Sequence, residues 1–139
     1  MIEAFHQLIA SRDIGVLATI RRDGRPQLSN VNYAYDRAAG TLRVSVTDGR
    51  AKTANLRRDP RASLEVTTPD LDRYVVVEGH ATLSPVAADP HDATVEELID
   101  IYRAIRGEHP DWADYRRAMV ADRRIALTIH IERMYGWPR

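Results

Sequence analysis

A short basic segment contains the residue types and the spacing that could bind a phosphate group. Lys52 is the single lysine among 20 basic residues, and Arg50 lies two positions before it. Both follow a strand-like run and Gly49, and they open a helix-compatible stretch, where backbone N–H groups point at a bound anion. An ammonium group and a planar guanidinium could hold two sides of one phosphate. At this point a lone lysine left by chance in an arginine-rich composition is an equally good explanation.

The composition of the chain excludes several classes of site. Its 139 residues are the usual size of one domain, so we expect a single domain over residues 1–139. The 20 basic and 20 acidic residues cancel, so we expect neither a nucleic-acid nor a membrane partner. The absence of cysteine excludes disulfides, thiolate catalysis and Cys-ligated metals. Residues 1–10 lack a signal-peptide pattern and no apolar run reaches membrane-spanning length, so a cytoplasmic protein is expected.

Apolar and polar residues alternate in several short runs, which predicts strands. Asp23 and Gly24 lie between two such runs, which is a strong signal of a hairpin. Short strands at hairpin spacing favour a small antiparallel barrel. The six strands predicted in this way cover residues 14–20, 27–35, 42–46, 62–67, 74–83 and 125–131.

Four segments have the spacing of helices. Pro60 ends the second of them, because the residue before a proline avoids the helical region. Trp112 and Tyr115 belong to the fourth, and we expect both to pack in a core or an interface. The predicted helices are a short one with Phe5, Leu8 and Ile9 on one face, one over 51–58, one that follows a capping box at 94–97, and one that begins at 109–111.

No residue has the sequence pattern of a metal ligand, a nucleophile or a general base. The five histidines are not spaced as a metal pair, and a hydrogen-bonded or solvated role is expected for His130. No Gly-x-Ser-x-Gly elbow occurs, although a Ser/His/Asp triad assembled by the fold stays open. The arginine doublets at 57–58, 116–117 and 123–124 have acids nearby, which is typical of a solvated helix face. If the protein is an enzyme, a cofactor carries the difficult step.

Three motifs, in this order and spacing, resemble one family. They are Gly-Arg-Pro-Gln-Leu-Ser-Asn at 24–30, Arg-Ala-Lys-Thr-Ala-Asn-Leu at 50–56 and Asp-Pro-Arg-Ala-Ser at 59–63. From about Ile14 to Trp137 the chain is similar to the pyridoxamine 5′-phosphate oxidase-like split β-barrel superfamily. Within it, the sequence most resembles the actinobacterial flavin/deazaflavin oxidoreductases of group B, which use coenzyme F420.

The resemblance implies a mainly β (α+β) fold, a six-stranded antiparallel split β-barrel with short helices. It also implies a homodimer with the cofactor groove at the subunit interface, where the partner supplies the start of the fifth strand. The basic segment binds the cofactor phosphate, two strands contact the deazaflavin ring, and an arginine meets the anionic tail. The cofactor-binding residues implied are Gln27, Leu28, Ser29, Asn30, Ser45, Val46, Arg50, Ala51, Lys52, Thr53, Arg61, Tyr74, Val75 and Val76.

The implied function is that of an F420-dependent oxidoreductase, which transfers hydride from the reduced deazaflavin to an electron-poor organic substrate. The alternatives are an FMN-binding oxidoreductase on the same barrel, a non-catalytic F420-binding or storage protein, and a dimeric interaction protein without a cofactor. FMN shares the ring and the phosphate, but the anionic tail of coenzyme F420 favours a chain with extra arginines. The ending at 134–139 lacks the Arg-Leu-x-Pro-like segment of pyridoxamine-phosphate oxidases, which argues against their activity.

Overall fold

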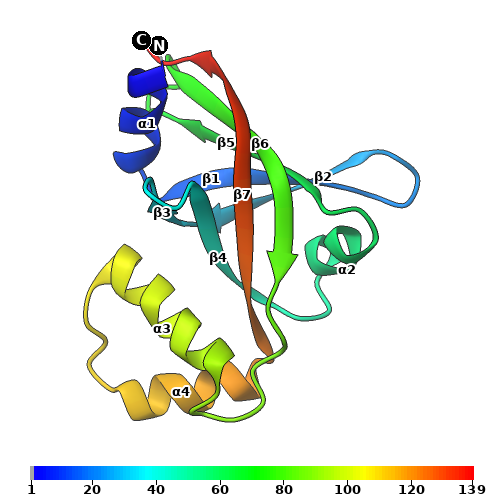
Figure 1. Ribbon diagram of the computed structural model, residues 1–139, viewed down its shortest axis with the longest axis vertical. Helices are drawn as coiled ribbons and strands as arrows, with labels where there is room; N and C mark the ends of the chain where they lie inside the picture. The colour runs from blue at the N-terminus through cyan, green and yellow to red at the C-terminus, as the bar shows by residue number, and fades with distance from the viewer. Residues whose placement is uncertain (1) are drawn as a thin grey trace.

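The computed structural model describes residues 2–139, and this range contains seven strands and four helices (Figure 1). All the strands pair antiparallel in one sheet, in the order β2-β1-β5-β6-β7-β4-β3. None of the helices in residues 2–139 has the length and apolar character needed to cross a membrane. The elements are α1 (Ile2–Ala10), β1 (Ile14–Ile20), β2 (Pro26–Asn32), β3 (Ala34–Asp36), β4 (Thr41–Thr47), α2 (Ala51–Arg58), β5 (Arg61–Thr67), β6 (Tyr74–Leu83), α3 (Ala93–Arg106), α4 (Trp112–Ala121) and β7 (Arg124–Trp137).

The sheet curls into an open barrel because its two outermost strands are consecutive in the sequence. β2 ends at Asn32 and β3 begins at Ala34, yet these strands occupy opposite edges of the sheet. The one residue between them, Tyr33, therefore makes the two edges meet. Its side chain is 2% exposed, its N–H donates to the carbonyl of Asp13 (2.9 Å) and its hydroxyl donates to the carbonyl of Ile9 (2.6 Å). Tyr33 thus anchors the corner at which the sheet returns on itself.

The prediction of six strands is wrong by one, and this corner is the reason. The run 27–35 is predicted as one strand, but β2 pairs with β1 whereas β3 pairs with β4. Side-chain alternation reports only that a segment is extended, so it cannot show where a strand changes its neighbour. The burial of Tyr33 and its two hydrogen bonds fix the change at this residue.

β7 is longer than the predicted strand over 125–131, and it lies between two other strands. It pairs with β4 over residues 124–130 and with β6 over residues 127–137, from Leu83 opposite Leu127 to Tyr74 opposite Trp137. The register with β6 shifts after Glu78, which marks a β-bulge. At Gly79 an added Cβ would lie 1.9 Å from the carbonyl oxygen of His130, so this crossing requires a glycine.

One hydrophobic cluster lies inside the barrel and a second lies outside it. The larger one fills the barrel, with α1 and α2 at its ends, and includes Leu42, Val44 and Val46 of β4, as their alternation predicts. The second lies outside the barrel, where α3 and α4 pack against Ala34 of β3 and Ala126 of β7. Figure 1 shows these two helices together on the side of the sheet away from α1. They form a helical wall beside β4.

The N-cap of α3 lies two residues before its predicted position. The capping box at 94–97 would make Thr94 the N-cap, but the cap is Asp92, whose carboxylate accepts from the N–H of Val95 (2.8 Å). Thr94 is inside the helix, and its hydroxyl donates to the carbonyl of Pro85 (2.9 Å). The hydroxyl therefore ties α3 to the end of β6. The end of α2 before Asp59 and Pro60 agrees with the prediction.

Candidate functional site

A gap opens in the barrel where β2 and β4 separate. β3 pairs only with residues 41–43 of β4, so residues 44–47 lack a neighbour on that side. β2 has turned away toward β1 and is the last strand on its edge of the sheet. Two strand edges with unpaired backbone N–H and C=O groups therefore face the same gap, and such groups bind polar ligand atoms.

A cavity of about 480 Å³ occupies this gap, a volume in the range of small-molecule and cofactor sites. Residues 30–32 of β2 and 44–47 of β4 line one side of it. The helical wall lines the other side with Ile101, Ile105 and Met119 among its apolar residues. We call this cavity the groove. It combines an apolar wall with a polar strand side, which suits a flat, partly polar molecule.

The groove is strongly cationic although the chain as a whole has no net charge. Arg50, Lys52, Arg106 and Arg124 line it, and no Asp or Glu of residues 2–139 does. Arg124 is already occupied, because its Nε donates to the carboxylate of Asp122 (2.5 Å). The other three form no ion pair with any residue in 2–139. Unpaired cations at a concave site attract an anionic ligand.

The turn between β4 and α2 brings Arg50 and Lys52 to the groove. Gly49 has a φ of 86°, which is the left-handed conformation that glycine adopts most readily. Arg50 is the N-cap of α2, and the hydroxyl of Thr53 donates to its carbonyl (2.8 Å). Burial and the neighbouring Arg50 guanidinium lower the pKa of Lys52. Both causes disfavour the ammonium form, so a bound anion would relieve them.

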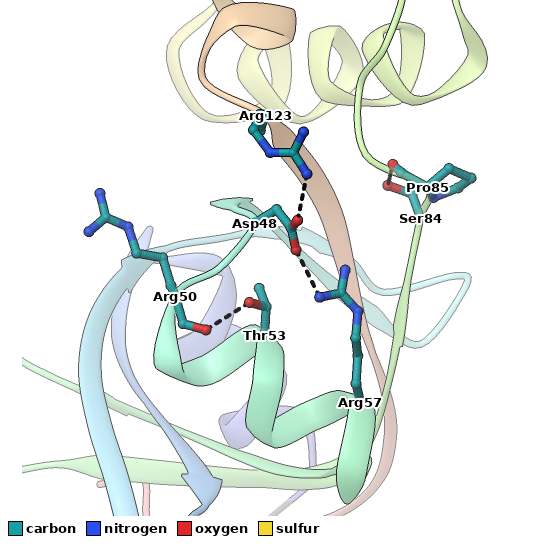
Figure 2. A network of polar contacts seen from close by, with 7 residues as sticks. All are labelled: Asp48, Arg50, Thr53, Arg57, Ser84, Pro85 and Arg123. Carbon is teal, nitrogen blue, oxygen red and sulfur yellow. Dashed lines mark hydrogen bonds and ion pairs between the residues drawn. The ribbon is translucent and has the colours of Figure 1, made fainter.

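Asp48 fixes this turn from behind (Figure 2). Its carboxylate accepts from Arg57 of α2 (2.8 Å) and from Arg123 before β7 (3.1 Å), while its N–H donates to the carbonyl of Arg123 (2.9 Å). These two guanidinium groups, that of Arg57 first, hold the pKa of Asp48 below its usual range. Figure 2 shows Arg50 pointing away from Asp48. The network therefore engages Arg57 and Arg123 and leaves Arg50 without an ion-pair partner among residues 2–139.

The structure brings five of the predicted site residues together at the groove: Asn30, Ser45, Val46, Arg50 and Lys52. Of the other residues predicted on β2, Gln27 and Ser29 point into the barrel and Leu28 points outward. The oxygen of the Gln27 amide accepts from the hydroxyl of Thr19, whose side chain is buried (3.1 Å). The Ser29 hydroxyl is buried and has no hydrogen-bond partner within residues 2–139. Because the side chains of Gln27 and Ser29 point inward, only their backbone groups remain available outside the core.

The remaining predicted residues lie outside the groove in this single chain. Ala51 is exposed in the first turn of α2, and Thr53 is buried beneath it. Arg61 forms a fork on Asp59, with contacts of 3.1 and 2.7 Å. Tyr74, Val75 and Val76 begin β6 at the end of the barrel near α1, and the Val75 side chain is fully buried in the core (Figure 1).

The helical wall is the part of the groove that the sequence does not reveal. The apolar spacing in α3 predicts a stripe that includes Tyr102 and Ile105, but these two side chains are only partly buried and line the groove with Arg106. Tyr115 packs as predicted, since it is buried and its hydroxyl donates to the carbonyl of Leu98 (3.0 Å). The only signal in the sequence for this wall is a polar residue, Arg106, at the edge of the apolar stripe of α3.

Two further predictions concern polar residues away from the groove. Arg116 is not on a solvated face: its guanidinium donates to the carbonyl of Pro90 (2.9 Å) and to the carboxylate of Glu96 (2.7 Å). His130 is hydrogen-bonded, with its Nε2 3.0 Å from the hydroxyl of Thr82, and it stacks on His80. Within residues 2–139 no three His, Asp or Glu side chains are grouped to hold a metal ion.

The groove is built on a fold that other proteins share. The profile of the pyridoxamine 5′-phosphate oxidase family matches residues 1–138. The chain belongs to this family. Among solved structures of the family fold, a conserved hypothetical protein from Mycobacterium tuberculosis is 26% identical, with a TM-score of 0.72 over 94% of this chain and 80% of that one. An F420 reductase is 27% identical, with a TM-score of 0.66 over 94% of this chain and 95% of that one.

Other members of the pyridoxamine 5′-phosphate oxidase fold are more distant. A FAD-binding protein from Mesorhizobium loti is 20% identical, with a TM-score of 0.69 over 98% of this chain and 91% of that one. At this identity the likeness concerns the fold alone. Membership of the family and the likeness to an F420 reductase support an oxidoreductase role.

Proposed function

We propose that this protein is an F420-dependent oxidoreductase of the group B deazaflavin type. The observation that carries the proposal is the groove itself, which has unpaired cations, no carboxylate among residues 2–139 and two free strand edges. The likeness to an F420 reductase over nearly the full length of both chains supports the choice of cofactor.

The residues of the groove fit a phosphate-bearing tricyclic cofactor. Arg50 and Lys52 would hold the phosphate, the first as a planar fork and the second as a compact charge. The free edges of β2 and β4, with Asn30 and Ser45, would hydrogen-bond the polar rim of the ring. The helical wall would exclude water from its other face, which strengthens every polar contact inside.

Coenzyme F420, when bound and reduced, supplies a hydride from C5 to an electron-poor carbon of the acceptor, which also takes up a proton from water. The protein's contribution is to hold the acceptor against the ring and to stabilise the negative charge that develops on it. Lys52 and the unpaired arginines provide the positive field for that purpose. Tyr115 does not supply the proton, because its hydroxyl is donated to Leu98 and burial raises its pKa to about 12.

The choice between coenzyme F420 and FMN rests on the anionic tail. Arg61 is the candidate for its carboxylates, and it would exchange Asp59, its present partner, for the tail. That exchange is inexpensive because Arg61 is exposed and exposed ion pairs contribute little. A cofactor with several tail carboxylates also gains more from the cationic surface than FMN does.

Titrations with coenzyme F420 and FMN, followed by cofactor fluorescence, test the proposal. We expect tighter binding of F420 at low salt and a steeper loss of its affinity as salt rises, because charge pairs are screened over about 10 Å at 0.1 M ionic strength. The reduced F420 complex, and not the FMN complex, should then reduce a quinone or enone. Tighter FMN binding with equal salt slopes would make the protein a flavin enzyme, and no binding of either would contradict both assignments.

We propose further that the protein is a homodimer that pairs through the outer face of β2, β1, β5, β6 and the end of β7. The helices plug the barrel ends or pack beside β4, and they leave this face open (Figure 1). It carries large apolar side chains in contact with water, including Leu28 (61% exposed), Tyr135 (44%) and Trp137 (64%). Tyr74 and Val76 point to the same face, where they lie opposite Trp137 and Tyr135. Large apolar side chains exposed on one face are typical of an interface.

Sedimentation of the wild-type protein at micromolar concentration should show a dimer. Replacing Trp137 with serine should shift the equilibrium toward monomer, because this large apolar side chain belongs to the proposed interface and is mostly exposed in one chain. Ile2→Ser is the matched control, since Ile2 is also exposed but lies on α1. A wild-type monomer, or equal effects of the two substitutions, would contradict the proposed interface.

A further inference from the structure

One side of α3 lines the groove and carries a cation to which the cofactor assignment gives no ligand. Ile101, Tyr102, Ile105 and Arg106 all line the groove, and their spacing places them on one helical face. The Tyr102 ring makes edge contacts with the rings of Tyr115 and Trp112, at centroid distances of 5.1 and 5.6 Å. Aromatic packing of this kind fixes the position of α3, and with it the backbone position of Arg106.

Arg106 is the cation on this face, and its charge has no partner within residues 2–139. Arg103, three residues earlier in the same turn, already has partners: it donates to Glu108 (3.0 Å) and its guanidinium lies 4.8 Å from the centre of the Trp112 ring. Both arginines are in the last turn of α3, where the helix dipole stabilises a cation. Arg103 already serves that purpose, so the dipole does not account for an arginine that lines the groove.

The position of Arg106 separates it from the phosphate end of the groove. In Figure 1 the start of α2, which carries Arg50 and Lys52, and the end of α3 lie on opposite sides of β4. In coenzyme F420 the tail extends from the phosphate, away from the ring. A cofactor whose phosphate is at α2 therefore directs its tail away from Arg106, so neither the phosphate nor the tail neutralises this guanidinium.

We infer that Arg106 binds a carboxylate of the acceptor, so that the substrates are flat, mostly apolar, electron-poor molecules that carry a carboxylate at one end. The apolar body packs on Tyr102 and Ile105, which are partly exposed, and the guanidinium binds the carboxylate with its two parallel N–H groups. A carboxylate at one end of an otherwise apolar acceptor fixes the orientation of that acceptor in the groove, and hydride transfer requires a fixed orientation. This inference rests on the proposed function.

The test compares two probes, an enone that carries a carboxylate and the methyl ester of the same enone. Binding of each to the F420-loaded dimer is measured by titration calorimetry, and activity is measured separately. Wild-type protein should bind the carboxylate more tightly than the ester. Arg106→Gln should weaken carboxylate binding about 10- to 100-fold, the range for losing a charge-assisted hydrogen bond, and should leave ester binding unchanged. Arg106→Lys should retain part of the preference because it keeps the charge and loses the fork.

Arg103→Gln is the matched control, because it removes the same charge from the same helical turn outside the groove. It should change neither probe's affinity. Equal affinity of wild-type protein for the two probes, or equal losses for both in Arg106→Gln, overturns the inference. The inference is also overturned if Arg106→Gln lowers the affinity for F420 but not for FMN, because Arg106 would then bind the anionic tail of F420. The same titrations without cofactor separate the two proposals: a carboxylate preference that depends on Arg106 would persist even if neither cofactor bound.

Discussion

Replacing Lys52 with alanine is expected to weaken binding of the phosphate-bearing cofactor by about 1–3 kcal/mol, the range for losing a charge-assisted hydrogen bond to an anion. Lys52 lines the groove, it is partly buried, and no carboxylate of residues 2–139 competes for it. Arg50→Ala should have a similar effect, since Arg50 lines the same end of the groove. Fluorescence titration of each variant with coenzyme F420 gives the measurement.

Arg117→Ala is the control for this experiment. Arg117 is two-thirds exposed and has only a 3.7 Å contact with Asp114, so its removal should not alter affinity. Arg116, beside it, is unsuitable because it bonds Pro90 and Glu96. If the control loses as much affinity as Lys52→Ala, overall charge and not a phosphate site explains the binding.

The same lysine should make affinity depend on pH. Burial and Arg50 lower its pKa below the ordinary 10.5, so the free protein loses this proton at a lower pH than a solvated lysine would. A bound phosphate favours the ammonium form, so affinity should be full below the pKa of the free protein and fall as pH rises through it. Lys52→Arg should remove this alkaline loss, because a guanidinium stays charged. A wild-type profile that matches Lys52→Arg would contradict the assignment.

Gly79→Ala is expected to destabilise the fold by at least about 3 kcal/mol, at the upper end of the range for overpacking a filled site. The new Cβ would lie 1.9 Å from the carbonyl oxygen of His130, and this neighbour is backbone that cannot rotate away. The bulge between β6 and β7 would have to move or open. Thermal unfolding should show a decrease in Tm on the order of 10 °C.

Gly24→Ala is the matched substitution, because it adds the same methyl group at a glycine with open space around it. Gly24 has a φ of 88° in the β1–β2 turn and no atom within 4 Å of an added Cβ. Its cost is conformational strain alone, about 1–2 kcal/mol. Equal losses at the two positions would show that the bulge can adjust, and the close approach at Gly79 would then have no effect on stability.

Local signals were sufficient for most of the fold. The Asp23–Gly24 hairpin, the alternation in β4 and the proline that ends α2 each depend on neighbours in sequence, and each prediction is confirmed. The division of one predicted strand at Tyr33 depends on contacts with Ile9 and Asp13, which are about 20 residues away. The extension of β7 depends on pairing with β6, which no pattern in residues 132–137 reveals.

The residues of the candidate site likewise divide into those that local sequence predicts and those that only the fold places. The basic segment at Arg50 and Lys52 is local, and the structure places it in the groove. Ser29 has a suitable residue type, but its parity on β2 turns the hydroxyl into the barrel, and parity follows from the sheet rather than from the motif. Arg106 is one of 19 arginines in the sequence, and only the packing of α3 beside β4 distinguishes it.

The place of β7 in the sheet has a consequence for how the chain acquires its structure. β7 follows both β4 and β6 in the sequence, yet it lies between them and joins two parts of the sheet that do not otherwise pair. Until β7 has been made, β6 and β4 each present an open edge, and edges of this kind recruit other chains. Closure of the barrel and assembly of the groove therefore wait for this fourteen-residue strand.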